Sequence, residues 1–234
     1  MPVPGLVFVT SRRRDTSKIS DEQFDRFYKD EQIPAALKFM RNSGYEQLAL
    51  RYKNVDTDSS RPYLALYPSP DASRMLLPEE DGFLERTKRS KALGGNVFDL
   101  IEFDFRPYEK IQTFEGYETG SKERGQTIVC VAMEPGSSKE QEQDFEDWYK
   151  MQHLDMLSMC RGYLRCTRYR RLDGHRPRYL ALHEYSCKPS ELPAEQIKQV
   201  TATEWTQKIL KEAQLFERDV FELVEVQGEV KAKL

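Results

Sequence analysis

The stretch FEDWYKMQH at residues 145–153 repeats, with informative changes, the stretch FDRFYKDEQ at residues 24–32. The correspondence continues along the chain: Gly44-Tyr45 and Arg51-Tyr52 return as Gly162-Tyr163 and Arg168-Tyr169, residues 61–66 as 176–182, and residues 97–102 as 220–225. A repeat of about a hundred residues has the size of a domain. We therefore expect two domains, 1–106 and 125–234, joined by a linker at 107–124.

Both copies have the same predicted order of elements, strand, helix, strand, strand, helix, strand. In the first copy we expect strands at 6–9, 45–52, 63–67 and 97–105. A first helix begins at the capping box of Ser20 and Gln23, is disturbed at Pro34 and ends before Gly44, and a second helix covers 82–93. In the second copy we expect strands at 126–133, 163–171, 179–185 and 220–226, and helices at 140–159 and 193–215.

This order is that of a ferredoxin-like βαββαβ unit, in which two helices cover one face of an antiparallel sheet. Several strands, such as residues 127–131 and 179–182, are apolar on both sides of the pleat, so both faces of each sheet must be covered. We therefore predict an α+β protein in which two tandem repeats pack their sheets into a pseudo-dimeric α+β barrel.

The composition excludes several classes of function. A net charge of −3 with interspersed charges argues against a nucleic-acid or anionic-membrane partner. Four cysteines lack the close pairs of zinc sites, which predicts reduced thiols and no metal. We also expect no secretory signal and no membrane span, and hence a cytoplasmic protein.

One residue distinguishes the two copies chemically, because the second copy has His153 where the first has Gln32. Helical spacing places His153 on one stripe with other apolar and aromatic residues: Phe145, Trp148, Tyr149, Gln152, Met156 and Met159. An imidazole in a partly apolar site can accept a proton near neutral pH. We therefore predict His153 and Tyr149 as catalytic candidates, although a hydrogen-bonded core histidine has the same pattern.

Further polar and aromatic side chains are predicted to bind the substrate. The phenols can polarise a carbonyl, Arg168 or Arg165 can hold a carboxylate, and His183 is expected at the mouth of a pocket. The predicted substrate-binding residues are Trp148, Tyr163, Arg168, Tyr169, Tyr179 and His183. His175 follows Asp173-Gly174 in a hairpin turn and is expected to be exposed. Neither a phosphate-binding loop nor a nucleophile elbow is present, so no nucleotide or flavin site is predicted.

The pattern of Phe145, Trp148-Tyr149 and His153, followed by Gly162-Tyr163 and a closing strand with Val220-Phe221, resembles the EthD-like branch of the dimeric α+β barrel superfamily. The resemblance covers most of each copy and implies work on small molecules, by cyclases, decarboxylases, lactone isomerases and cofactor-free monooxygenases, alongside haem-binding relatives. In the EthD-like pattern a proline commonly follows the histidine by two residues. Here the first copy has Pro34 without the histidine, and the second has His153 without the proline.

Three functions remain open at this point. We expect a cofactor-independent enzyme that cyclises, dehydrates, decarboxylates or isomerises an aromatic or polyketide-like molecule of secondary metabolism by acid–base catalysis in the second copy. The alternative is a non-catalytic, stress-related protein that binds a small molecule, or haem with His153 as axial ligand. An RNA-binding module shares the element order but requires an RNP1-like strand, which the sequence lacks. The intramolecular pseudo-dimer leaves a further homodimer open.

Overall fold

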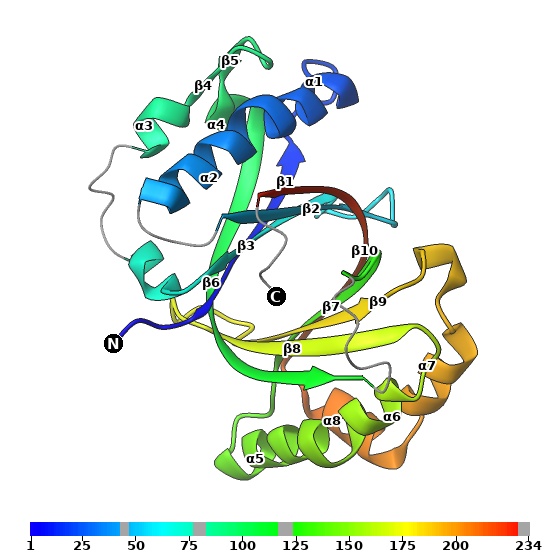
Figure 1. Cartoon of the computed structure of the whole chain (residues 1–234). Helices are drawn as coiled ribbons and strands as arrows, with labels where there is room; N and C mark the ends of the chain where they lie inside the picture. The colour runs from blue at the N-terminus through cyan, green and yellow to red at the C-terminus, as the bar shows by residue number, and fades with distance from the viewer. Residues whose placement is uncertain (43–46, 77–82, 117–123, 229–234) are drawn as a thin grey trace. The chain divides into compact units, whose positions relative to one another are not determined.

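The chain divides into two compact units in the computed structural model, which describes residues 1–42, 47–76, 83–116 and 124–228 (Figure 1). Unit 1 comprises Met1–Glu109 and Val224–Leu234, and unit 2 comprises Lys110–Leu223. The strands β6 (Ile101–Glu115) and β10 (Leu215–Gly228) each contribute residues to both units. The predicted linker at 107–124 is therefore strand as far as Glu115. Its many charged residues suggested a linker, but a strand accommodates them at its exposed positions.

Unit 1 follows the predicted order in its first half. Its further elements are β1 (Gly5–Arg13), α1 (Asp21–Arg26), the π-helical turn η1 (Phe27–Gln32), α2 (Ile33–Asn42), β2 (Leu48–Asn54), β3 (Tyr63–Ser69), the 3-10 helix η2 (Ala72–Leu76), α3 (Phe83–Thr87), β4 (Arg89–Ser90), β5 (Gly95–Asn96) and α4 (Val97–Leu100). The capping box at Ser20 and Gln23 is confirmed.

The second half of unit 1 differs from the prediction. The expected helix at 82–93 is wrong beyond Thr87, because β4 and β5 form a short hairpin whose turn contains Gly94 at φ 72°. A strand was also expected to begin at Val97, but the Asn96 side chain accepts a hydrogen bond from the Phe98 N–H and caps α4. The strand begins only at Ile101.

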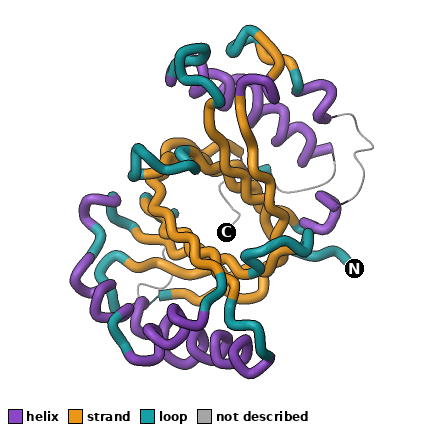
Figure 2. Tube along the Cα trace, turned by 180° about the vertical axis from the view of Figure 1, so that it is seen from behind, coloured by secondary structure: helices purple, strands orange, loops and turns teal. Residues whose placement is uncertain are grey.

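Unit 2 has the same opening order and two further helices. Its elements besides those shared with unit 1 are β7 (Thr127–Glu134), α5 (Lys139–Trp148), the π-helical turn η3 (Tyr149–His153), α6 (Leu154–Ser158), β8 (Tyr163–Arg171), β9 (Tyr179–Tyr185), the 3-10 helix η4 (Pro189–Glu191), α7 (Ala194–Thr201) and α8 (Glu204–Glu212). In the lower part of Figure 2 the helices of unit 2 lie together along one side of its strands. The helix expected at 193–215 is in fact two helices, because Thr203 caps a new one by accepting from the Thr206 N–H.

All the described strand pairs of the large sheet are antiparallel. In unit 1, β1 pairs with β3 and β6, and β2 pairs with β3. In unit 2, β9 pairs with β7 and β8, and β7 also pairs with β10. Because β6 and β10 take part in both sheets, the order of hydrogen-bonded neighbours closes as β1-β3-β2-β10-β7-β9-β8-β6. The predicted α+β class with its antiparallel barrel sheet is confirmed. That the units arose by tandem duplication stays a prediction.

A π-helical turn interrupts the first long helix of each unit. In unit 2 the Leu154 N–H bonds to the Tyr149 carbonyl, five residues back. This adds a residue to one turn and shifts the buried stripe. Phe145, Trp148 and Tyr149 are buried as predicted, but in the helix beyond the turn the buried residues are Leu154, Leu157 and Ser158. Met159, which uninterrupted α-helical spacing placed on the stripe, is exposed.

Candidate functional site

His153 ends the π-helical turn of unit 2 and points toward the sheet, as the sequence predicted. Its imidazole is stacked on the Trp148 indole, with ring centroids 4.1 Å apart and planes inclined by 26°, and meets Tyr149 edge-on at 5.5 Å. The residue is 7% exposed, and its Nδ1 atom is buried without a hydrogen-bond partner among the described residues. Trp148 lies five residues before His153, so the extra residue of the π-turn brings the two rings into register.

The sheet presents a second histidine to the first. His183 on β9 lies with its ring centroid 6.1 Å from that of His153, and its Nδ1 is 3.3 Å from the Tyr163 hydroxyl of β8. Gly162, at φ 77°, makes the turn that leads into Tyr163. Cys166 lies directly opposite His183 on β8 and is fully buried. We call His153, His183, Trp148, Tyr149, Tyr163 and Cys166 the unit 2 cluster.

Burial sets the protonation of the unit 2 cluster. It lowers the pKa of His153 well below its ordinary value, with the neighbouring His183 and Arg168 adding to the effect. It lowers the pKa of His183 to about 3, reinforced by Arg218 and Arg168. Burial also raises the pKa of Tyr163 well above its ordinary value and that of Cys166 to about 12. At neutral pH the cluster therefore consists of neutral imidazoles, phenols and a thiol.

Arg168 is buried beside the cluster with its guanidinium already engaged. It lies 3.9 Å from the centroid of the Tyr149 ring and donates to both carboxylate oxygens of Glu146, at 2.9 and 3.1 Å. It also donates to Oε1 of Gln112 at 2.9 Å. This arrangement fixes the α5 helix against β8. A substrate carboxylate would have to displace these partners.

The remaining predicted site residues lie apart from His153 or differ from expectation. Tyr179 is on the same face of β9 as His183, four residues away, and its hydroxyl donates to Glu142. Tyr169 follows Arg168 on β8 and so points to the opposite face of the sheet, which removes it from the cluster. His183 is 3% exposed rather than at a pocket mouth, because its ring faces those of His153 and Tyr163. His175 is exposed, as predicted.

Unit 1 has the same scaffold without the same chemistry. Arg51 lies 4.8 Å from the centroid of the Tyr28 ring and pairs with Asp25, as Arg168 does with Tyr149 and Glu146. The Tyr28 hydroxyl donates to Ser11 at 2.8 Å. The positions that correspond in the sequence repeat to the two histidines of the unit 2 cluster are held by Gln32 and Tyr67. The units thus share the arginine, tyrosine and carboxylate contacts that hold the helix on the sheet. They differ at the two histidine positions, whose side chains could transfer a proton.

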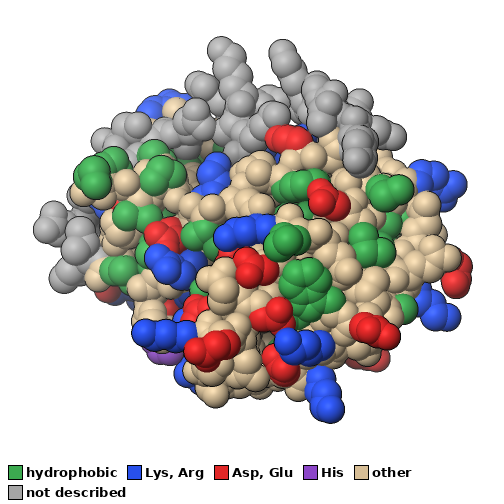
Figure 3. Space-filling view, turned by 90° about the horizontal axis from the view of Figure 1, so that it is seen from below, with side chains coloured by type: hydrophobic (Ala, Val, Ile, Leu, Met, Phe, Trp, Pro, Cys, Tyr) green, Lys and Arg blue, Asp and Glu red, His purple; other side chains and the backbone are tan. Residues whose placement is uncertain are grey.

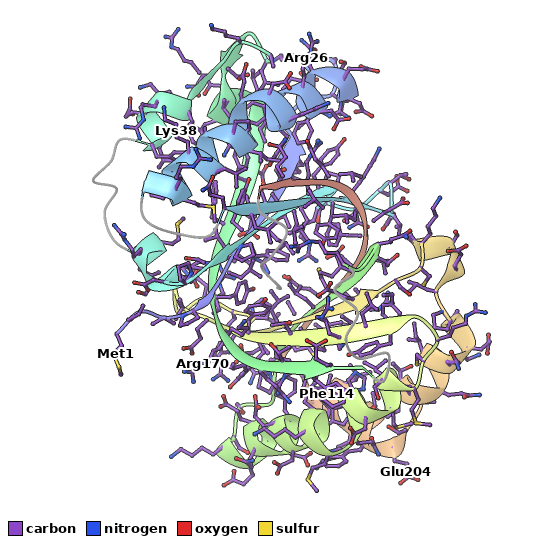
Figure 4. The ribbon with its side chains drawn as sticks, in the orientation of Figure 1. Met1, Arg26, Lys38, Phe114, Arg170 and Glu204 are labelled. Carbon is purple, nitrogen blue, oxygen red and sulfur yellow. The ribbon has the colours of Figure 1, made fainter. Side chains whose placement is uncertain are left out.

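Sequence reasoning missed several supports of the cluster. Thr206 of α8 accepts the Trp148 Nε1–H at 3.0 Å and is buried. Cys166, Glu146 and Gln112 were also overlooked as partners. No local signal identifies Thr206 or Gln112, since they lie more than 50 residues from the side chains that they contact. Phe114, labelled in Figure 4, packs against the same hydrophobic core.

Among the residues that the structure describes, no three His, Cys, Asp or Glu side chains come together in a way that could hold a metal ion. Within the same residues, no helix is long and apolar enough to cross a membrane. The face shown in Figure 3 carries basic and acidic side chains interspersed with hydrophobic ones. This face gives no indication of a surface of one charge sign.

Comparisons with known proteins found one relative by sequence and several solved structures with a similar fold. No family model matches the chain. The Core atranone cluster (CAC) protein 1 of Stachybotrys chlorohalonatus is 25% identical over 217 residues, which cover 83% of this chain and 87% of the relative. A mutant chlorite dismutase from Candidatus Nitrospira defluvii has a TM-score of 0.60 at 8% identity, with 95% of this chain and 91% of the other covered. An anthrone oxidase-like protein has a TM-score of 0.52 at 12% identity, with 98% and 95% covered. At these identities the solved structures show a shared fold alone.

Proposed function

We propose, from the dimeric α+β barrel fold that this chain has, that it is a secondary-metabolite enzyme that moves a proton on a small aromatic or polyketide-like molecule. The observation that carries the proposal is the buried Nδ1 of His153, which has no hydrogen-bond partner in the described part of the chain and whose ring contacts those of Trp148 and His183. The relative named for an atranone cluster supports the link to secondary metabolism.

The proposed chemistry starts with neutral His153. Its imidazole takes a proton from a carbon next to a substrate carbonyl, and the electron pair of the broken C–H bond stays on the substrate as an enolate. The Tyr163 phenol, which burial keeps protonated, is close enough to His183 to donate to it or to a substrate oxygen. Without a substrate the low pKa of His153 makes it a weak base. During the reaction, the negative charge of the enolate must therefore stabilise the positive charge of the His153 imidazolium that forms beside it.

The same imidazolium then returns the proton. Return to another atom isomerises the substrate, and return to a leaving hydroxyl dehydrates it. In a ring closure the enolate carbon attacks a second carbonyl carbon of the substrate, and the oxygen of that carbonyl takes the proton. In a decarboxylation His153 instead takes the carboxyl proton, loss of CO2 leaves the enolate, and the proton returns to its carbon. A reaction of the enolate with dioxygen would be the cofactor-free oxygenase version. All of these reactions share a proton transfer at His153. Burial of the cluster excludes water from the reacting atoms.

The alternative of a haem protein fits these residues poorly. An axial bond from His153 requires a flat macrocycle across the end of its ring. Trp148 stacks on that ring at 4.1 Å, and the Tyr149 and His183 centroids lie at 5.5 and 6.1 Å. A group as wide as the macrocycle would have to displace these rings, which disfavours haem more than a smaller substrate. A Soret band in the absorbance of the purified protein would reverse this conclusion.

The test of the proposed function compares matched variants of the two units. The full chain is incubated with extracts of aromatic and polyketide metabolites, and conversion is followed by liquid chromatography and mass spectrometry. His153→Asn should abolish conversion and Gln32→Ala should leave it unchanged. Equal loss in both variants, or none in either, would contradict a site confined to unit 2. Retention of a ligand without conversion would favour the non-catalytic binding protein.

A further inference from the structure

We infer that Thr206 is a positioning residue for His153, because its hydroxyl holds the Trp148 indole and the indole holds the imidazole by stacking. The inference rests on the proposed function in taking His153 as the group that moves the proton. It adds that the N-terminal turn of α8 fixes the orientation in which His153 does so.

The first contact joins α8 to the indole. The Trp148 Nε1–H donates to the Thr206 hydroxyl oxygen at 3.0 Å, and the two residues are 2% and 1% exposed. The Thr206 hydroxyl in turn donates to the Val200 carbonyl at 3.3 Å, and its oxygen lies 2.8 Å from that of the Thr203 hydroxyl. Three neighbours thus surround a hydroxyl that has one proton and two lone pairs. These neighbours fix the acceptor of the indole N–H in place.

The second contact joins the indole to the imidazole. The two ring centroids are 4.1 Å apart and the planes are inclined by 26°, so the indole covers one face of the His153 ring. A buried indole N–H that lost its acceptor would be unsatisfied, and this penalty favours any rotation that brings the N–H to another partner. Such a rotation would break the stack. The hydrogen bond to Thr206 therefore holds the Trp148 ring, and with it the plane of the imidazole.

The same turn of α8 also reaches the backbone segment that carries His153. The Thr203 hydroxyl caps α8 by accepting from the Thr206 N–H at 3.2 Å. It also lies 3.1 Å from Oε1 of Gln152, the residue that precedes His153 in the π-helical turn. One turn of α8 thus contacts both the ring that stacks on His153 and the residue next to it in the chain.

Unit 1 has different residues at the corresponding positions of the sequence repeat. Phe27 stands where unit 2 has Trp148, and a phenyl ring has no N–H that needs an acceptor. Glu31 stands where unit 2 has Gln152, and its Oε1 accepts from the Ala92 N–H at 2.9 Å rather than from a threonine. The indole and its acceptor therefore occur in the unit whose π-helical turn contains a histidine. This pattern is expected of a contact that serves the histidine, since phenylalanine is enough for packing in unit 1.

The experiment is proton–carbon correlation NMR of the full chain with labelled histidine at pH 7.5. The chain has three histidines, and the signal that disappears in His153→Gln identifies His153. The ring current of the stacked indole should move the Cε1–H signal of His153 upfield of that of His175, which is 74% exposed. Thr206→Val should lose most of this upfield shift, and Thr206→Ser, which keeps a hydroxyl, should retain it.

Two further variants separate positioning from a general loss of stability. Trp205→Phe removes another indole hydrogen bond between α8 and α5, from Nε1 to Asp144 at 3.1 Å, and should retain the upfield shift. Trp148→Phe leaves no N–H to hold, so adding Thr206→Val to it should leave the His153 signal where Trp148→Phe alone puts it. The double variant buries no unsatisfied N–H, so this comparison gives an answer even where Thr206→Val alone does not fold.

Four outcomes would overturn the inference. They are a wild-type His153 signal without the upfield shift; an upfield shift that survives in Thr206→Val; a loss of the shift in Trp205→Phe equal to that in Thr206→Val; and a His153 signal that differs between Trp148→Phe and the double variant. The last outcome would mean that Thr206 acts on His153 without the indole.

The proposed function fails separately. Exchange of deuterium into the carbon acid anthrone reports proton transfer, and Thr206→Val should lower the acceleration of this exchange by about tenfold to a hundredfold. If the NMR shifts follow Thr206 but the wild type does not accelerate exchange, the positioning stands and the proposed function falls. If exchange depends on His153 but neither the shift nor the exchange responds to Thr206→Val, the proposed function stands and the positioning falls.

Discussion

Replacing His183 by glutamine should make unit 2 markedly less sensitive to acid. His183 is 3% exposed, and its burial, reinforced by the charges of Arg218 and Arg168, lowers its pKa from an ordinary value of about 6.5 to about 3. The folded state therefore holds the neutral imidazole, and the unfolded state takes up the proton first. The stability that His183 contributes is complete above pH 6.5 and is lost as the pH falls from there toward 3.

The size of the effect follows from these two pKa values. Between pH 7 and pH 5 the unfolded imidazole passes from mostly neutral to almost fully protonated, while the folded one stays neutral. The linkage relation gives a loss of about 2 kcal/mol in the free energy of unfolding over this interval for His183 alone. His153 acts in the same direction, because its pKa is also lowered by burial. The wild-type protein should therefore lose more than the amount expected for one histidine.

The assay is urea unfolding at pH 7, 6 and 5, followed by tryptophan fluorescence. Both tryptophans, Trp148 and Trp205, belong to unit 2, so the signal reports on that unit. The quantity compared is the change in unfolding free energy with pH, because His183→Gln also loses the contact with Tyr163 at every pH. His175→Gln is the control, since that side chain is 74% exposed and should leave the acid dependence as in the wild type. An acid dependence in His183→Gln as steep as in the wild type would refute the reasoning.

Two further predictions concern the supports of unit 2. Thr206→Val removes the acceptor of the Trp148 indole N–H and should lower the free energy of unfolding by about 1–3 kcal/mol. The measurement is urea titration, with Thr201→Val on α7 as the control. An unchanged midpoint would show that the hydrogen bond is dispensable. Glu184→Gln breaks a buried ion pair with Arg165, whose Nη1 is 3.0 Å from the carboxylate, and also weakens the bond from the Gly125 N–H. Because Glu115 stays 3.2 Å from the same guanidinium, the variant should cost less than the about 3–5 kcal/mol of a buried charge left wholly unpaired, seen as a lower thermal midpoint. An unchanged midpoint would mean that Glu115 alone compensates the charge of Arg165.

Much of the fold could be predicted because the local sequence patterns and the internal repeat indicate the same secondary structure. The apolar strands, the capping box at Ser20 and the repeat itself all indicate the same element order. The prediction failed where a local feature overrides periodicity. Gly94 and Asn96 convert the end of a predicted helix and the start of a predicted strand into a hairpin and a capped turn.

The candidate site was predictable in its residues and less so in its geometry. Helical spacing placed His153, Trp148 and Tyr149 on one buried face, as the structure does. It could not reveal the π-helical turn, which stacks His153 on Trp148 and exposes Met159. The alternation of side chains along a strand predicts that Tyr169 lies on the face of β8 opposite Arg168, so its absence from the cluster could have been predicted from the sequence. The engagement of Arg168 by Gln112 depends on β6, a segment that the sequence marked as linker.

The most direct test of proton transfer by His153 is deuterium exchange into a carbon acid, followed by proton NMR without oxygen. Anthrone in deuterated buffer with the full chain would report loss of its acidic C–H signal. We predict that the wild type and Gln32→Ala accelerate the exchange and that His153→Gln lowers the acceleration by at least about a hundredfold, the lower range for a general base. Exchange that is no faster than in buffer, or that persists in His153→Gln, would contradict the account.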